Sequence, residues 1–149
     1  MAVSARIVNA ERLKQELEHL GVNVTTKVAT DAAKAGGTEL INYAKINVIS
    51  NFKMRSWNLY DSLKVVVTSA GYVRAGSYRN AYARIQEFGG TIVPKRAHFL
   101  SWIDDDGVMR FARSVTIPPR PFIRPAYDEH KDDIIKAMSN VIESYLKTV

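Results

Sequence analysis

The strongest constraint on this chain is residues 117–126, ten residues that hold four of its five prolines. Each proline fixes φ at about −65° and lacks a backbone N–H, so the run can form neither a helix interior nor a central strand. The residue before each proline is also biased toward the extended region. We therefore predict a stiff connector over residues 118–125. Pro125 suits the first position of a helix, so a C-terminal helix is expected over residues 126–147.

The side chains of this connector allow two interpretations. In an extended chain alternate residues face one side, so Arg120, Phe122 and Arg124 would present two cations and a ring together as a docking surface. In the alternative, the connector is a rigid loop in which Phe122 and Ile123 are buried in the chain's own core and both arginines are solvated. The sequence leaves both interpretations open.

Length and composition fit one soluble globular domain over residues 1–149. The chain is 46% hydrophobic, which is enough to bury a core, and its net charge of +6 favours encounters with polyanions without identifying one. The absence of cysteine excludes disulfides, thiolate catalysis and cysteine-ligated zinc. No apolar run approaches the roughly 18 residues of a membrane span, and the first residues lack a signal-peptide pattern, so we expect an unprocessed protein without a membrane partner.

Apolar residues at steps of three and four predict two amphipathic helices, over residues 4–20 and 25–52, within a helical region over residues 1–52. The pair Gly36-Gly37 lies in the middle of the second helix. Each glycine costs about 1 kcal/mol there, so we expect a kink, a break or a close helix crossing, and we favour the kink. The small-residue half, residues 29–37, is the better candidate for contact between subunits.

Short β-branched and alternating runs over residues 60–117 predict a small sheet. A glycine between two such runs predicts a hairpin over residues 62–76, and the Asp-Gly step at 106–107 predicts a second. Between them a short helix is expected near residues 80–88, ended by a pair of glycines. The predicted fold class is α+β, a small antiparallel sheet of hairpins in a meander, packed by the long N-terminal helix and by a C-terminal helix that covers the sheet.

Residues able to carry catalysis or bind metal are scattered. His19, His98 and His130 lie on separate elements without metal-ligand spacing. The acidic run at residues 104–107 lacks the glutamate that an EF-hand needs at its twelfth position, which is Val115 here, so we interpret it as a charged hairpin tip. No phosphate-binding loop or nucleophile elbow occurs in the sequence. We therefore predict no enzyme activity and no catalytic, metal or cofactor site.

Several basic residues form a candidate phosphate-contacting surface. Lysine and arginine can contact phosphates without reading sequence. No helix combines a dense basic face with base-reading residues, so sequence-specific recognition is not expected. An ordinary solvated basic surface is the alternative. The candidate residues are Lys95, Arg96, Arg110 and Arg113.

Two stretches carry a family resemblance. Residues 82–91, YARIQEFGGT, and residues 119–126, PRPFIRPA, resemble the paired YA…EFG and PARPFLRPA signatures of the Hong Kong phage gene-product-ten-like tail-component family. The order of the predicted elements also matches. Here Pro119 is followed directly by Arg120, where the family has a small residue between them, and Ile123 replaces a leucine. A related family of contractile-tailed phages, which is similar in these elements, also consists of tail-completion proteins.

The resemblance implies a structural virion morphogenesis protein that acts in tail completion or as a tail terminator. It would form a hexameric ring around the DNA channel, at the head–tail neck or the head-proximal tail end of the virion, after assembly in the host cytoplasm. The implied partners are copies of itself, the tail tube protein and a head-completion or stopper protein. The resemblance also implies non-specific contact with passing genomic DNA, and it implies no cofactor. The residues that would face the DNA channel are Lys95, Arg96, Arg110 and Arg113.

From the stiffness of the connector and this resemblance we predict that the two motifs meet, within one subunit or across the ring. Glu87 is then the candidate carboxylate partner for one of the connector arginines. The predicted subunit-interface or docking residues are Glu87, Phe88, Gly89, Gly90, Arg120, Phe122 and Arg124.

Two other functions stay open. Charge alone suggests a sequence-independent nucleic-acid-binding accessory protein, for which the affinity for duplex DNA should fall steeply with salt. A hydrolase with an unrecognised site comes third.

Overall fold

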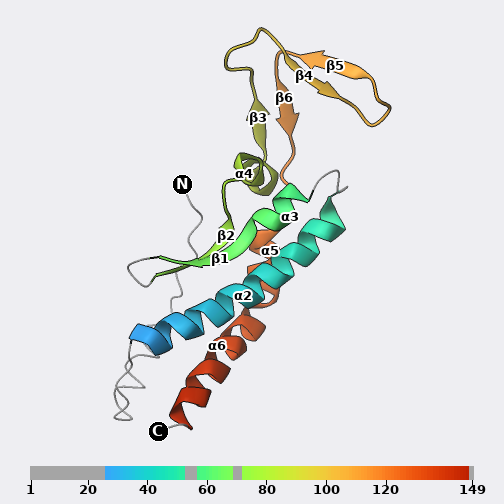
Figure 1. Cartoon of the computed structure of the whole chain (residues 1–149). Coiled ribbons are helices and arrows are strands. Elements are labelled where there is room, and N and C mark those ends of the chain that lie inside the picture. Colours follow the sequence, from blue (N-terminus) through green and yellow to red (C-terminus); the bar gives the residue numbers. More distant parts are fainter. Residues whose placement is uncertain (1–25, 53–56, 69–71, 148–149) are drawn as a thin grey trace. The chain divides into compact units, whose positions relative to one another are not determined.

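The computed structural model of the chain describes residues 26–52, 57–68 and 72–147 (Figure 1). The helix predicted over residues 4–20 lies outside these residues. The described residues up to Asn80 and those from Phe122 on form a first compact unit, and Ala81–Pro121 form a second. The helices are α2 (Thr26–Asn51), α3 (Asn58–Ser62), α4 (Ala81–Phe88), α5 (Ile123–Glu129) and α6 (Lys131–Leu146). The strands are β1 (Leu63–Val67), β2 (Val73–Ser77), β3 (Gly90–Ile92), β4 (Leu100–Ile103), β5 (Met109–Ala112) and β6 (Val115–Ile117).

The predicted α+β class is confirmed. The strands pair as three two-stranded antiparallel sheets, β1 with β2, β3 with β6 and β4 with β5. Both predicted hairpins form, and in the first the register runs from Leu63 opposite Ser77 to Val67 opposite Val73. The pairing of β3 with β6 is a further sheet that the sequence did not predict.

Helix α2 forms the centre of the first unit. It contacts α5, α6 and the β1–β2 hairpin, and Figure 1 shows it running alongside α6. The α6 helix packs most extensively on α2, and α2 in turn contacts the hairpin. Helix α2 therefore links α6 to the hairpin. Burying each of the larger apolar side chains on α2 stabilises the fold by about 1.5–3 kcal/mol. The buried residues of its C-terminal half are Leu40, Ile41, Ala44 and Val48.

The glycine pair in α2 allows close approach on two sides. Helix α2 continues through Gly36 and Gly37 without a break. A Cβ on Gly36 would lie 2.7 Å from Cγ of Met138 in α6, and a Cβ on Gly37 would lie 3.3 Å from Cγ1 of Val65 in β1. The sequence allowed a kink, a break or a close helix crossing at this point. The two glycines make the close crossing possible.

The small-residue half of α2 packs inside the chain. Ala32 and Ile142 are buried together, and Met138 packs against them. Residues 29–37 were predicted as a contact between subunits because small side chains permit close approach. The structure corrects this prediction, because α6 of the same chain packs against that surface.

The C-terminal region contains two helices where the sequence predicts one. Helix α5 begins at Ile123, so Pro125 is its third residue and not its first. The first four N–H groups of a helix lack intrahelical partners, so a proline at that position removes no hydrogen bond. Helix α5 ends at Glu129, and His130, with φ of −121° and ψ of 24°, separates it from α6. The His130 ring stacks on Tyr43 of α2, with 3.5 Å between ring centroids.

Two tyrosine–aspartate hydrogen bonds join α2 to α6. The Tyr145 hydroxyl donates to Oδ2 of Asp31 at 2.6 Å, and the Tyr43 hydroxyl donates to Oδ2 of Asp133 at 2.9 Å. The bond to Asp31 raises the pKa of Tyr145 above its ordinary value, and partial burial adds to the effect. The bond to Asp133 does the same for the pKa of Tyr43, with smaller contributions from burial and from the charge of Glu39.

Candidate functional site

In the second unit, the end of α4 meets the proline connector. Gly89 ends the helix with φ of 71°, and its N–H donates to the Ile85 carbonyl at 2.8 Å. A Cβ on Gly89 would lie 2.9 Å from Cδ of Pro119 and 3.0 Å from the carbonyl oxygen of Ile117. Real side chains do not tolerate such distances, and the left-handed backbone also disfavours them. Glycine is therefore required here for both its conformation and its size.

One backbone hydrogen bond joins the two motifs. The Arg120 N–H donates to the carbonyl of Gln86 at 2.7 Å. That carbonyl is among the last four of α4, which have no partner within the helix. Prolines occupy positions 118, 119 and 121, so Arg120 supplies the only backbone donor in residues 118–121. The motifs therefore meet within one chain, through the main chain of Arg120.

The side chains of the α4 motif differ widely in exposure. Gln86 is 3% exposed, and its Oε1 has no hydrogen-bond partner among the described residues. Glu87 is also buried, whereas Phe88 is exposed. The pairing of Glu87 with a connector arginine stays a prediction. Gly89 and Gly90 both have positive φ, and Gly90 is the first residue of β3.

The connector side chains do not form the alternating surface. Phe122 is 0% exposed; its ring lies edge-on to Phe52, with 6.1 Å between centroids, and its carbonyl accepts from Asn47 Nδ2 at 3.1 Å. Arg120 and Arg124 are exposed. The extended run stops before Phe122 because α5 begins at the next residue, so the two-residue period no longer applies. For Phe122 the alternative interpretation, burial in the chain's own core, describes the structure.

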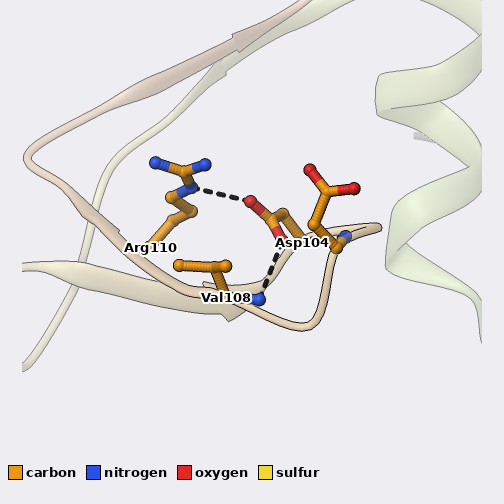
Figure 2. Close-up of polar contacts among 4 residues, drawn as sticks. Asp104, Val108 and Arg110 are labelled. Atoms are coloured by element: carbon orange, nitrogen blue, oxygen red, sulfur yellow. Dashed lines mark hydrogen bonds and ion pairs between the residues drawn. The ribbon is translucent and has the colours of Figure 1, made fainter.

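The β4–β5 hairpin, which we call the arm (residues 99–113), has a tip organised by one carboxylate. Figure 2 shows Asp104 Oδ1 accepting from the Val108 N–H at 2.9 Å, while Oδ2 accepts from Nε of Arg110 at 2.7 Å. Oδ1 also accepts from the Asp106 N–H at 3.0 Å. Gly107 closes the turn with φ of 78°. The acidic run is thus a hairpin turn, as the sequence predicted.

The arm has an apolar surface that the described residues leave exposed. Its strands make their extensive contacts with each other. Cross-strand partners share one face, which places Ile103 with Met109 and Phe111 opposite Ser101. Leu100 is half-buried, but six other large hydrophobic residues of the arm are 40–67% exposed, and they are Phe99, Trp102, Ile103, Val108, Met109 and Phe111.

The four residues predicted to face DNA fall into two pairs. Arg110 is bound to Asp104, and the guanidinium of Arg113 lies 5.9 Å from the centroid of the Phe99 ring, within the range of a cation–π contact. Lys95 and Arg96 are exposed in the segment that joins β3 to β4. The charge at the arm is therefore partly engaged locally, and the more accessible cations lie before it.

Neither a metal site nor a membrane-crossing helix occurs in the described part of the chain. No group of three or more His, Asp or Glu side chains gathers there as metal ligands. No helix within residues 26–52, 57–68 and 72–147 combines the length and the apolar character that a membrane crossing requires.

Comparisons of this chain with protein-family models, with curated proteins and with solved structures give no match. The resemblance to the phage tail-component family therefore depends on the two motifs and the order of the elements.

Sequence reasoning missed the exposed apolar surface of the arm. Large hydrophobic residues occur at both odd and even positions of β4, such as Trp102 and Ile103, whereas a half-buried strand would show strict alternation. The lack of alternation in β4 was the signal available for a hairpin whose apolar side chains stay exposed.

Proposed function

We propose that this protein is a structural morphogenesis protein of a tailed bacteriophage that assembles into an oligomeric ring. The ring would lie at the head–tail neck or at the head-proximal end of the tail, where it completes or terminates the tail around the DNA channel. Its partners would be further copies of itself, six to match a tail tube, with the tail tube protein on one side and a head-completion or stopper protein on the other. It performs no catalysis in this role.

The observation that carries the proposal is the junction of the two motifs. Residues 86–89 and 119–120 are distant in sequence, yet one backbone hydrogen bond and the close approach at Gly89 bring them together. Glycine and proline at these positions have specific structural tasks, so the two motifs form one physical unit in this chain. This supports the family resemblance from which the function is inferred.

Electron microscopy and sedimentation of the purified full chain over a range of concentrations test this proposal. Discrete closed rings, or particles that cap isolated phage tail tubes, are expected. A chain that stays monomeric at the highest concentration and neither forms rings nor caps tubes would contradict it.

A sequence-independent nucleic-acid-binding role is the second candidate, and the exposure of Lys95 and Arg96 favours it. Such binding depends on phosphate contacts, so the affinity for duplex DNA should fall steeply as salt rises. In a filter-binding assay the double variant K95A/R96A should lose affinity equally for unrelated DNA sequences and show a shallower salt dependence. The matched variant K34A/K136A removes the same charge from α2 and α6 and should bind as the unsubstituted chain does. Tight, salt-dependent binding by a monomer would favour this role over ring assembly.

A further inference from the structure

A ring of identical subunits requires two different surfaces on each copy, because a head-to-tail interface joins one patch of a subunit to another patch of its neighbour. The described residues hold two exposed apolar surfaces, one in each compact unit. The first is the arm. The second lies where α2 and α3 pack together.

One face of the arm is large enough to account for about half of one side of an interface. An aromatic side chain offers about 150–250 Å² for burial, so the four half-exposed hydrophobic residues of that face leave on the order of 400 Å² of apolar surface. They are Phe99, Ile103, Met109 and Phe111. The largest apolar patch on a soluble monomer is typically about 300–600 Å², and a standard interface buries about 800 Å² per partner. A two-stranded hairpin is also marginally stable alone in water, and gains from packing against another surface.

The second surface, which we call the α2–α3 patch, is contiguous across two helices. Ile46 and Ile49 are exposed on α2. Lys45, four residues before Ile49 and so on the same face, places Nζ 4.6 Å from the centroid of the Tyr60 ring. That ring packs edge-on against Trp57, with 5.4 Å between centroids, and Trp57 is 57% exposed. The patch therefore joins two aliphatic side chains, two rings and one cation.

We propose that the arm of one copy docks on the α2–α3 patch of the next copy. The two surfaces suit each other in character, since both are apolar and aromatic, and tryptophan and tyrosine are the residues that most often anchor interfaces. Their charges are complementary as well, because the arm tip carries Asp105 and Asp106 and the patch carries Lys45. This inference rests on the proposed function, for which it names the subunit interface.

The absence of cysteine from the chain allows a direct test. The full-length variants I103C, on the arm, and I49C, on the patch, are purified separately, mixed at a concentration at which the unsubstituted chain assembles, and oxidised. Each copy carries one thiol, so every disulfide formed is intermolecular. We expect the mixed 103–49 disulfide to exceed the products of two matched mixtures, S114C with I49C and I103C with N140C, by about tenfold or more, because Ser114 and Asn140 are exposed but lie outside both surfaces.

A substitution in the arm provides the second measurement. F111S removes a ring from the proposed contact, and V93S removes an exposed side chain of the same unit outside the arm. Circular dichroism checks that both variants fold. We expect F111S in the I103C chain to reduce the mixed disulfide about tenfold, as is typical for an interface aromatic, and V93S to leave it unchanged.

The outcomes separate this interface from the ring itself. A mixed disulfide no more abundant than in the controls overturns the arm-to-patch contact, and so does a dominant product of I103C with itself, which indicates arm-to-arm docking. If microscopy of the same samples still shows rings, the proposed function stands and only this interface is wrong. If the mixed disulfide forms in open chains that never close, the interface is supported and the ring is not.

Discussion

At the scale of single residues, two glycines with similar backbones occupy different surroundings. Gly89 and Gly107 have φ of 71° and 78°. A Cβ on Gly107 would meet no atom within 4 Å, whereas one on Gly89 would lie 2.9 Å from Pro119. The left-handed conformation costs an L-residue about 1–2 kcal/mol at either position, but only Gly89 adds a steric clash. Comparing Gly107 with Gly89 therefore separates the cost of a left-handed backbone from the cost of a steric clash.

We expect G107A to destabilise the arm by about 1–2 kcal/mol and G89A to destabilise the motif junction by about 2–4 kcal/mol. Amide hydrogen exchange measures each effect locally, at the β4–β5 amides for G107A and at the Arg120 amide for G89A. Equal losses of protection in the two variants would mean that the connector yields to the added methyl group and that the close approach is not rigid.

The two tyrosine–aspartate bonds predict a loss of stability in alkali. Only the neutral phenol can donate to the carboxylate, and the pKa of Tyr43 and Tyr145 is raised in the folded chain above the ordinary value of 10.0. A folded-state pKa above the unfolded one contributes stability that is fully present below pH 10.0 and is lost as pH rises through the raised value. Around Tyr43 the facing groups are Asp133, Glu39 and the stacked ring of His130.

The free energy of unfolding, measured in urea from about pH 8 to pH 11, should therefore fall at the alkaline end. Y145F should be less stable than the unsubstituted chain at neutral pH and show a shallower decline in alkali. Y72F serves as the control, because Tyr72 is 72% exposed. An alkaline decline that is equally steep in Y145F would assign the effect to other groups.

At the scale of elements, the spacing of α2 and α6 is set by Gly36. An alanine there gains about 1 kcal/mol of helix propensity, but its Cβ would lie 2.7 Å from Cγ and 2.9 Å from Sδ of Met138. Overpacking typically costs about 1–3 kcal/mol, so G36A should be destabilising by about 1 kcal/mol overall. The neighbouring G37A meets Val65 at 3.3 Å and should be close to neutral.

A double-mutant cycle tests whether Met138 is the cause. In the M138A chain the clashing atoms are gone, so G36A should change from destabilising to stabilising by up to about 1 kcal/mol. Unfolding in urea gives the four free energies. If G36A costs the same with and without Met138, then helix α6 does not limit the approach.

Local patterns predicted helix α2 and the arm well. The stripe through Leu40, Ala44 and Val48 marked α2 to within one residue at each end, and the Asp-Gly step marked the arm, because both signals lie within a few residues of each other in the chain. The β3–β6 sheet gave no such signal. Its strands are three residues long and lie far apart in sequence, and the pairing of Thr91 with Thr116 is visible only once the chain has folded.

Tertiary packing overrode local bias at the start of α5. The residue before a proline is disfavoured in a helix, yet Arg124 is helical. Burial of Phe122 immediately before the helix is consistent with this override, because the ring is fully removed from water. The motif junction was also predicted only in part. The stiffness of the connector and the family resemblance led to the prediction that the motifs meet, but they did not indicate that the main chain of Arg120 makes the contact.

At the scale of the whole molecule, the two units should differ in how assembly changes them. Helix α2 is buried on several sides within its own chain, whereas, among the described helices and strands, the arm makes extensive contacts only between its own two strands. Opening free energies follow such contacts, so the arm amides of the dilute chain should exchange with solvent much faster than those of α2. When a second copy covers a surface, the amides of that surface exchange more slowly, and this protection grows with the fraction of chains that are bound.

Hydrogen exchange measured below and above the concentration of assembly tests this directly. At a subunit concentration of about 100 times the dissociation constant, binding adds about 2.7 kcal/mol, so exchange in the arm should slow about a hundredfold. Amides at the centre of α2, which are already protected, should change little and serve as the internal control. An arm that exchanges as fast in the assembled particle as in the free chain would show that no copy covers it, and the contact that closes the ring would have to be sought on another surface.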